Sequence, residues 1–122
     1  MHDTPTGLLR NFLIVTPNVV VAEDLKEILA EFGGGVVEVF ASMASTWKGT
    51  YDAAFFAIPV GDLLHERRIR DMHDAGTRVV VLDGGLPESA YYGTGLFTLP
   101  HPFRTEDVIA VLEKIGITKP DG

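Results

Sequence analysis

Residues 11–17 have the sequence Asn-Phe-Leu-Ile-Val-Thr-Pro, a short apolar run that ends at a proline. A continuous run of this length predicts a strand buried on both faces, because a half-exposed strand would alternate apolar and polar residues. The segment that follows places apolar side chains at helical spacing, with acidic residues between them: Val21, Leu25, Ile28, Leu29 and Phe32. We therefore expect an amphipathic helix that begins at Asn18 as its N-cap and ends at the glycines of residues 33–35.

The same alternation continues to the end of the chain. Further apolar runs predict strands at residues 36–41, 51–58, 78–82 and 95–99. Helical segments are expected between and after them, at residues 42–49, 62–75 and 86–93 and from Thr105 onward, with Thr105 as the last N-cap. Five strands that alternate with five helical segments predict a three-layer α/β/α domain with a parallel sheet.

Length and composition indicate one globular domain and exclude several classes of protein. The chain has 122 residues, of which 46% are hydrophobic, and we expect a domain at residues 10–116 between a flexible tail at 1–9 and a tail or linker at 117–122. The absence of cysteine excludes a thiol nucleophile, a disulfide framework and a cysteine-based zinc site. The net charge of -7 argues against binding to a nucleic-acid backbone. Without a membrane span or a signal peptide, the chain is expected to be cytoplasmic and to have no membrane contact.

Candidate functional residues are those that follow the predicted strands, because ligands bind beyond the carboxyl ends of the strands in open α/β sheets. These positions hold the segments 16–18 (Thr-Pro-Asn), 57–59 (Ala-Ile-Pro), 83–85 (Asp-Gly-Gly) and 100–103 (Pro-His-Pro-Phe). None of them matches a glycine-rich phosphate-binding motif or the glycine–serine elbow of a hydrolase.

Four stretches of the sequence, taken in order, resemble the receiver (CheY-like) domain of response regulators in two-component signal transduction. Residues 12–15 resemble the opening strand of that family, and residues 51–57 the run that ends in its phosphoacceptor. Residues 78–83 resemble the fourth strand and its switch position, and His-Pro-Phe at 101–103 resembles the Lys-Pro-Phe signature. The resemblance covers residues 10–116 and implies a flavodoxin-like sheet with strand order 2-1-3-4-5.

The residues that carry receiver chemistry are replaced in this chain. Thr16 and Pro17 stand where the family holds Mg²⁺ with an acidic pair, and Ala57 stands at the phosphoacceptor aspartate. Asp83 replaces the hydroxyl residue of the switch, and His101 replaces the lysine that pairs with phosphate. Phosphoryl transfer to a carboxylate needs that carboxylate and a cation to offset the developing charge. We therefore expect a degenerate receiver, or pseudo-receiver, with no catalytic residues, no metal and no cofactor.

Asp83 and His101 are expected to face each other across the vestigial pocket. The simplest interpretation is a fixed polar pair that closes the pocket. Two alternatives remain open: a sensor of pH or of a small molecule, since histidine titrates near neutral pH, and an enzyme that uses Asp83 and His101 as base and orienting group.

The function that we expect is protein–protein interaction without phosphorylation, in signalling or in the regulation of an assembly. In receivers, partners and second copies dock on the face formed by the fourth helix, the fifth strand and the last helix. Here that face would carry Tyr91, Tyr92 and Phe97, and aromatic residues are enriched at binding surfaces. A plainer interpretation, that Phe97 and one tyrosine fill the core, is left open.

Overall fold

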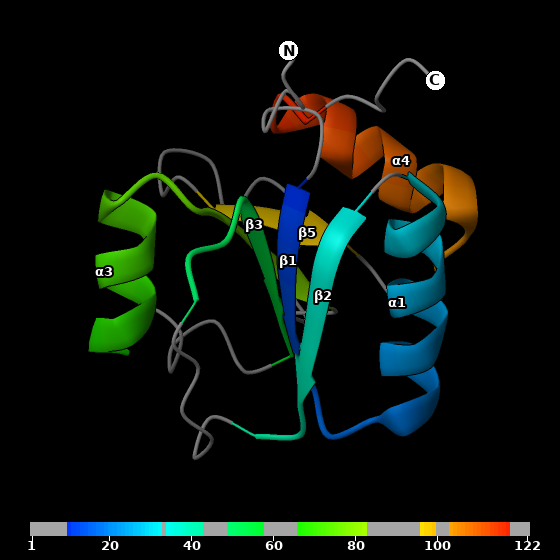
Figure 1. Cartoon of the computed structure of the whole chain (residues 1–122), viewed down its shortest axis with the longest axis horizontal. Coiled ribbons are helices and arrows are strands. Elements are labelled where there is room, and N and C mark those ends of the chain that lie inside the picture. The colour runs from blue at the N-terminus through cyan, green and yellow to red at the C-terminus, as the bar shows by residue number, and fades with distance from the viewer. Residues whose placement is uncertain are drawn as a thin grey trace, which may run out of the picture.

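The computed structural model describes residues 10–32, 34–42, 49–57, 66–82, 96–99 and 103–117. In chain order its elements are β1 (Arg10–Val15), α1 (Val19–Phe32), β2 (Gly34–Phe40), β3 (Ala53–Phe56), α3 (Arg67–Asp74), β4 (Arg78–Leu82), β5 (Leu96–Leu99) and α4 (Thr105–Lys114). The five strands pair in parallel in the order β2-β1-β3-β4-β5 (Figure 1). The predicted flavodoxin-like α/β fold is confirmed.

The helices form two outer layers around the sheet (Figure 1). Helices α1 and α4 cover one face, and α3 covers the other. Successive residues of β1 alternate between the two cores: Phe12 and Ile14 lie beneath α1 and α4, whereas Leu13 and Val15 lie on the face that α3 covers. The apolar parts of β1, β3 and β4 are buried throughout, as their continuous apolar runs predict.

The start of α1 follows from the side chain of Asn18. Its Oδ1 accepts a hydrogen bond of 3.1 Å from the backbone N–H of Val21, which would otherwise lack a partner in the first turn. The predicted N-cap is therefore confirmed. Of the predicted apolar stripe, Ile28 is only partly buried, and the other members are buried together with Ala22.

The structure corrects three element boundaries. Strand β2 begins at Gly34 rather than residue 36, because Arg10 pairs with Gly34 and the register then shifts by one residue. Tyr51 is buried but precedes β3, which spans only the centre of the run predicted at 51–58. The N-cap of α4 is Arg104 and not Thr105, since the carboxylate of Asp107 accepts the backbone N–H of Arg104 at 2.8 Å and fixes the turn one residue earlier.

Several predicted elements fall wholly or largely outside the described residues: the tails at 1–9 and 117–122 and the helical segments at 42–49 and 86–93. The helix predicted at 62–75 corresponds to α3, which begins only at Arg67, because Glu66 has an extended backbone and is its N-cap. Within the described ranges, no helix is long and apolar enough to cross a membrane.

Candidate functional site

The carboxyl edge of the sheet brings together two of the predicted pocket residues. Thr16 follows β1 directly, and Ala57 follows β3, the strand beside it. The backbone N–H of Ala57 donates to the carbonyl of Val15 at 2.9 Å, which places the ends of the two strands side by side. The parallel topology therefore brings Thr16 and Ala57 together at this edge, where Ala57 contributes only a methyl group.

The polar groups of Thr16 are already engaged in local structure. Its side chain is buried, and its Oγ1 accepts the backbone N–H of Asn18 at 3.1 Å. Its backbone N–H donates to the carbonyl of Phe40 at 3.0 Å, which ties the turn to β2. Thr16 thus orders the turn that leads into α1, whereas Pro17 beside it is exposed.

The described part of this edge offers no carboxylate to a cation or to a phosphoryl group. Thr16, Pro17 and Ala57 carry a hydroxyl group, a pyrrolidine ring and a methyl group. Across the described residues, no three His, Asp or Glu side chains lie close enough to hold a metal ion. Asp83 and His101 lie outside the described residues, so the polar pair and the two functions that depend on it remain expectations.

The predicted docking face is described only at Phe97. This residue lies in β5, is half-buried, and packs against the core beneath α1 and α4. Part of its ring therefore fills the core, which agrees with the plainer of its two interpretations. Tyr91 and Tyr92 lie outside the described residues.

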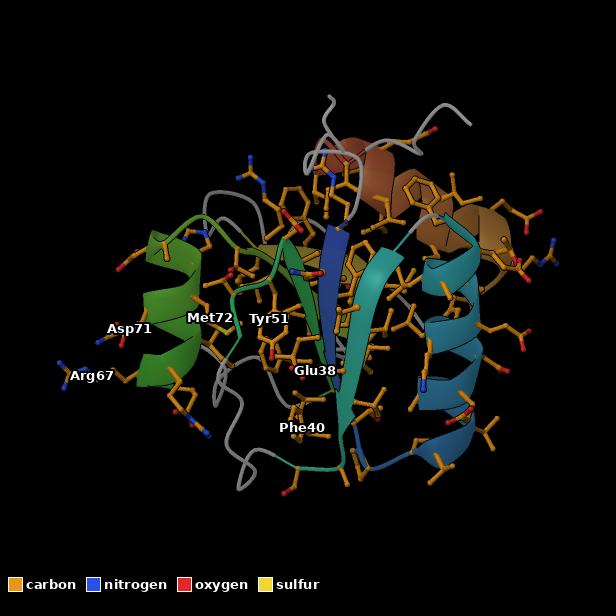
Figure 2. The ribbon with its side chains drawn as sticks, in the orientation of Figure 1. Glu38, Phe40, Tyr51, Arg67, Asp71 and Met72 are labelled. Atoms are coloured by element: carbon orange, nitrogen blue, oxygen red, sulfur yellow. The ribbon has the colours of Figure 1, made fainter. Side chains whose placement is uncertain are left out.

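On the opposite face of the sheet, Tyr51 forms a polar contact that sequence analysis did not single out. Its hydroxyl group donates to Oε1 of Glu38 on β2, and its ring lies between β2 and Met72 of α3 (Figure 2). Burial raises the pKa of Tyr51 to about 12, and the hydrogen bond to Glu38 and its negative charge add to the shift. No short sequence motif connects the two residues, which are 13 positions apart.

The amino edge of the sheet holds an open, polar hollow of about 550 Å³. Asp52 lines this hollow. Its Oδ2 accepts the backbone N–H of Asn11 at 2.8 Å, and its Oδ1 lies 3.8 Å from Nη1 of Arg10. Its backbone carbonyl also accepts the N–H of Arg78 at 3.0 Å. These bonds hold the starts of β1, β3 and β4 together, so Asp52 has a structural role in this hollow.

The described residues also leave apolar side chains exposed near the carboxyl edge. Val19 and Val20, at the start of α1, are 72% and 68% exposed, and Val39, near the end of β2, is 36% exposed. The buried face of α1 consists of Val21, Ala22, Leu25, Leu29 and Phe32, so Val19 and Val20 are not part of the core. The position of Val19 and Val20 on a helical wheel of α1 predicts that both are exposed, but isolated exposed valines are common and carry little information about function.

Comparison with known proteins supports the fold. No protein-family model matches the sequence, and no curated protein is found as a relative. A crystal structure of a protein from Burkholderia pseudomallei, described as pilus assembly-related, superposes with a TM-score of 0.63 at 11% sequence identity. The match covers 99% of this chain and 100% of that one. At this identity the likeness concerns the architecture of the whole domain.

Proposed function

We propose that this chain is a receiver-like interaction domain that docks a protein partner without phosphoryl transfer and takes part in regulating an assembly. The observation that carries the proposal is the carboxyl edge of the sheet, where Thr16, Pro17 and Ala57 offer no carboxylate; the resemblance to receivers implies that these are the positions of the acidic pair and the phosphoacceptor. The chain keeps a receiver-like fold, whereas Thr16, Pro17 and Ala57 do not supply the carboxylates that phosphoryl transfer needs.

The chemistry of the described part of this edge argues against phosphoryl transfer. Phosphoryl transfer proceeds through positioning and charge neutralisation, and Mg²⁺ in such sites is held by carboxylates and by phosphate oxygens. Ala57 cannot act as a nucleophile, and Thr16 supplies a hydroxyl group, whose oxygen accepts the N–H of Asn18, in place of a carboxylate. A domain with this edge can still transmit a signal by docking, since docking needs only a complementary surface.

Two lines of support bear on the partner. The solved structure that shares the fold is described as pilus assembly-related, which suggests a protein assembly as the setting. The chain has a net charge of -7, which disfavours nucleic acid. A protein partner, or a second copy docked through the β5–α4 face near Phe97, is therefore the class of interaction that we assign.

Intact-mass spectrometry after incubation with acetyl phosphate and Mg²⁺ tests the proposal. We expect no phosphorylated chain, and we expect none from Ala57→Asp either, because restoring the nucleophile leaves Thr16 and Pro17 unable to hold the cation. An intact receiver domain serves as the positive control for the donor. An acid-labile phosphoryl adduct on the wild-type chain would overturn the proposal.

A further inference from the structure

Two arginines line the hollow at the amino edge of the sheet. Arg10 opens β1 and Arg78 opens β4, and β3 lies between these strands, so the two backbones are about 10 Å apart. Each arginine lies two residues before a member of the core beneath α1 and α4, Phe12 on β1 and Val80 on β4. Because side chains alternate along a strand, both arginines project from the same face of the sheet. The fold thus brings two guanidinium groups to one open space of about 550 Å³.

The guanidinium group of Arg10 has no hydrogen-bonded carboxylate. Its Nη1 lies 3.8 Å from Oδ1 of Asp52, which is beyond hydrogen-bond range, and Oδ2 of Asp52 accepts the backbone N–H of Asn11. Among the side-chain atoms of the described residues, Nε of Arg10 is the one that is buried without a hydrogen-bond partner. A buried donor without an acceptor is rare in folded proteins. The orphaned Nε therefore agrees with an acceptor that comes from outside the chain.

The second guanidinium group, on Arg78, is exposed. The backbone of Arg78 is fixed, since its N–H donates to the carbonyl of Asp52 at 3.0 Å. Its side chain forms no ion pair with a carboxylate of the described part of the chain. The described lining of the hollow therefore carries two positive charges against the single negative charge of Asp52, in a chain whose net charge is -7. A local excess of positive charge in an acidic protein favours the binding of an anion.

The helix ends that border the hollow do not cancel this positive charge. Helices α3 and α4 both end here, at Gly76 and Gly116, and the carboxyl end of a helix carries a partial negative charge. Both last turns are closed, however, because the backbone N–H groups of Thr77 and Ile117 bond carbonyls of these turns at 3.0 and 2.8 Å. The φ angles of 104° and 90° at the two glycines permit these closures. The full charges of the arginines thus dominate the hollow.

We infer that this hollow binds a small molecule through an oxyanion, a phosphate or carboxylate group, held between Arg10 and Arg78. A guanidinium group presents paired N–H donors that match two oxygens of either group. Thr50 and Asn11 line the same space and offer a hydroxyl group and an amide to the rest of the ligand. The volume of about 550 Å³ lies within the range of small-molecule sites, about 300–1,000 Å³. The site lies at the opposite edge of the sheet from the vestigial pocket and is separate from the docking proposed above.

An NMR titration of the amide signals tests the inference, with pyrophosphate and citrate as probes and sodium chloride added to keep the ionic strength constant. We expect saturable shifts with at least one probe at Asn11 and Gly76, which line the hollow. Arg10→Gln and Arg78→Gln should each weaken the affinity about tenfold or more, because each removes charge-assisted hydrogen bonds to the anion. The control is Arg70→Gln, which removes the same charge from an exposed position of α3 and should leave the affinity within about twofold.

A conservative variant separates charge from geometry. Arg10→Lys keeps the positive charge but lacks the paired donors, so it should recover only part of the affinity that Arg10→Gln loses. Circular dichroism checks that each variant folds, and pyrophosphate or citrate, whichever binds, should raise the Tm of the wild-type chain more than that of Arg10→Gln. The tighter of the two probes assigns the anionic group as phosphate or carboxylate. Two results would overturn the inference: no saturable shift with either probe on the wild-type chain, or an equal loss of affinity in Arg70→Gln and Arg10→Gln.

Discussion

The contact between Tyr51 and Glu38 gives a prediction that can be worked out in free energy. Tyr51 is 6% exposed, and its hydroxyl group donates to the carboxylate of Glu38. Tyr51→Phe keeps the ring and removes the hydroxyl group, and with it the bond to Glu38 and the backbone hydrogen bond to Gly49. Because Glu38 is exposed and regains water, the expected loss in the free energy of unfolding at neutral pH is about 1 kcal/mol.

Alkaline pH should reverse the order of stability of the wild-type chain and Tyr51→Phe. The pKa of Tyr51 is about 12 in the folded chain and about 10 when unfolded, so above pH 10 the unfolded state releases a proton that the folded state keeps. The wild-type chain therefore loses stability between about pH 10 and pH 12, by about 2 kcal/mol at pH 12. Tyr51→Phe has no such loss and should become the more stable protein above about pH 11.

Urea unfolding followed by circular dichroism, at a series of pH values from 7 to 12, measures both effects. Absorbance of the phenolate form is an independent check, since the variant should lack one tyrosine that titrates near pH 12. Unfolding free energies that stay separated by a constant amount over the whole range would refute the reasoning, because the raised pKa would then not exist.

Three further predictions test the structural account. Asp52→Ala should lower the free energy of unfolding by about 1–2 kcal/mol in thermal unfolding, because the backbone N–H of Asn11 loses its partner. The control is Asp74→Ala, at a side chain that is 82% exposed, which should change the free energy of unfolding by less than about 0.5 kcal/mol. Asn18→Ala should cost about 1 kcal/mol in urea unfolding by removing the cap of α1, and Asn18→Asp should recover most of it. Glu27→Lys should stabilise the fold by about 1 kcal/mol in urea unfolding, since its repulsion with Glu23 and Glu31, each four residues away on α1, becomes attraction; a loss of stability would contradict the charge argument.

Much of this architecture is predictable from sequence because strand burial and strand order follow from a few strong patterns. The apolar runs at 12–15 and 79–82 are typical of strands buried on both faces, and Asn18 at the head of an apolar stripe marks a helix start. Boundaries were less predictable where backbone interactions decide them. The early start of β2 depends on a register shift opposite Arg10, which no local pattern encodes.

The candidate site was predictable in part for a topological reason. Parallel strands end at one edge, so the adjacency of Thr16 and Ala57 follows once their strands are placed next to each other. The contact between Tyr51 and Glu38 and the exposure of Val39 could not be anticipated. Both depend on how side chains of separate elements meet across the faces of the sheet, and residue spacing along the chain does not record that.

The central claim is that this domain docks a partner without phosphorylation, and cross-linking in the native extract tests it most directly. The tagged chain would be cross-linked with and without acetyl phosphate and Mg²⁺, and the bound proteins identified and quantified. The account predicts the same partner, recovered in the same amount under both conditions. Recovery of the chain alone, or a yield that changes with the phosphodonor and not with a mock addition, would contradict it.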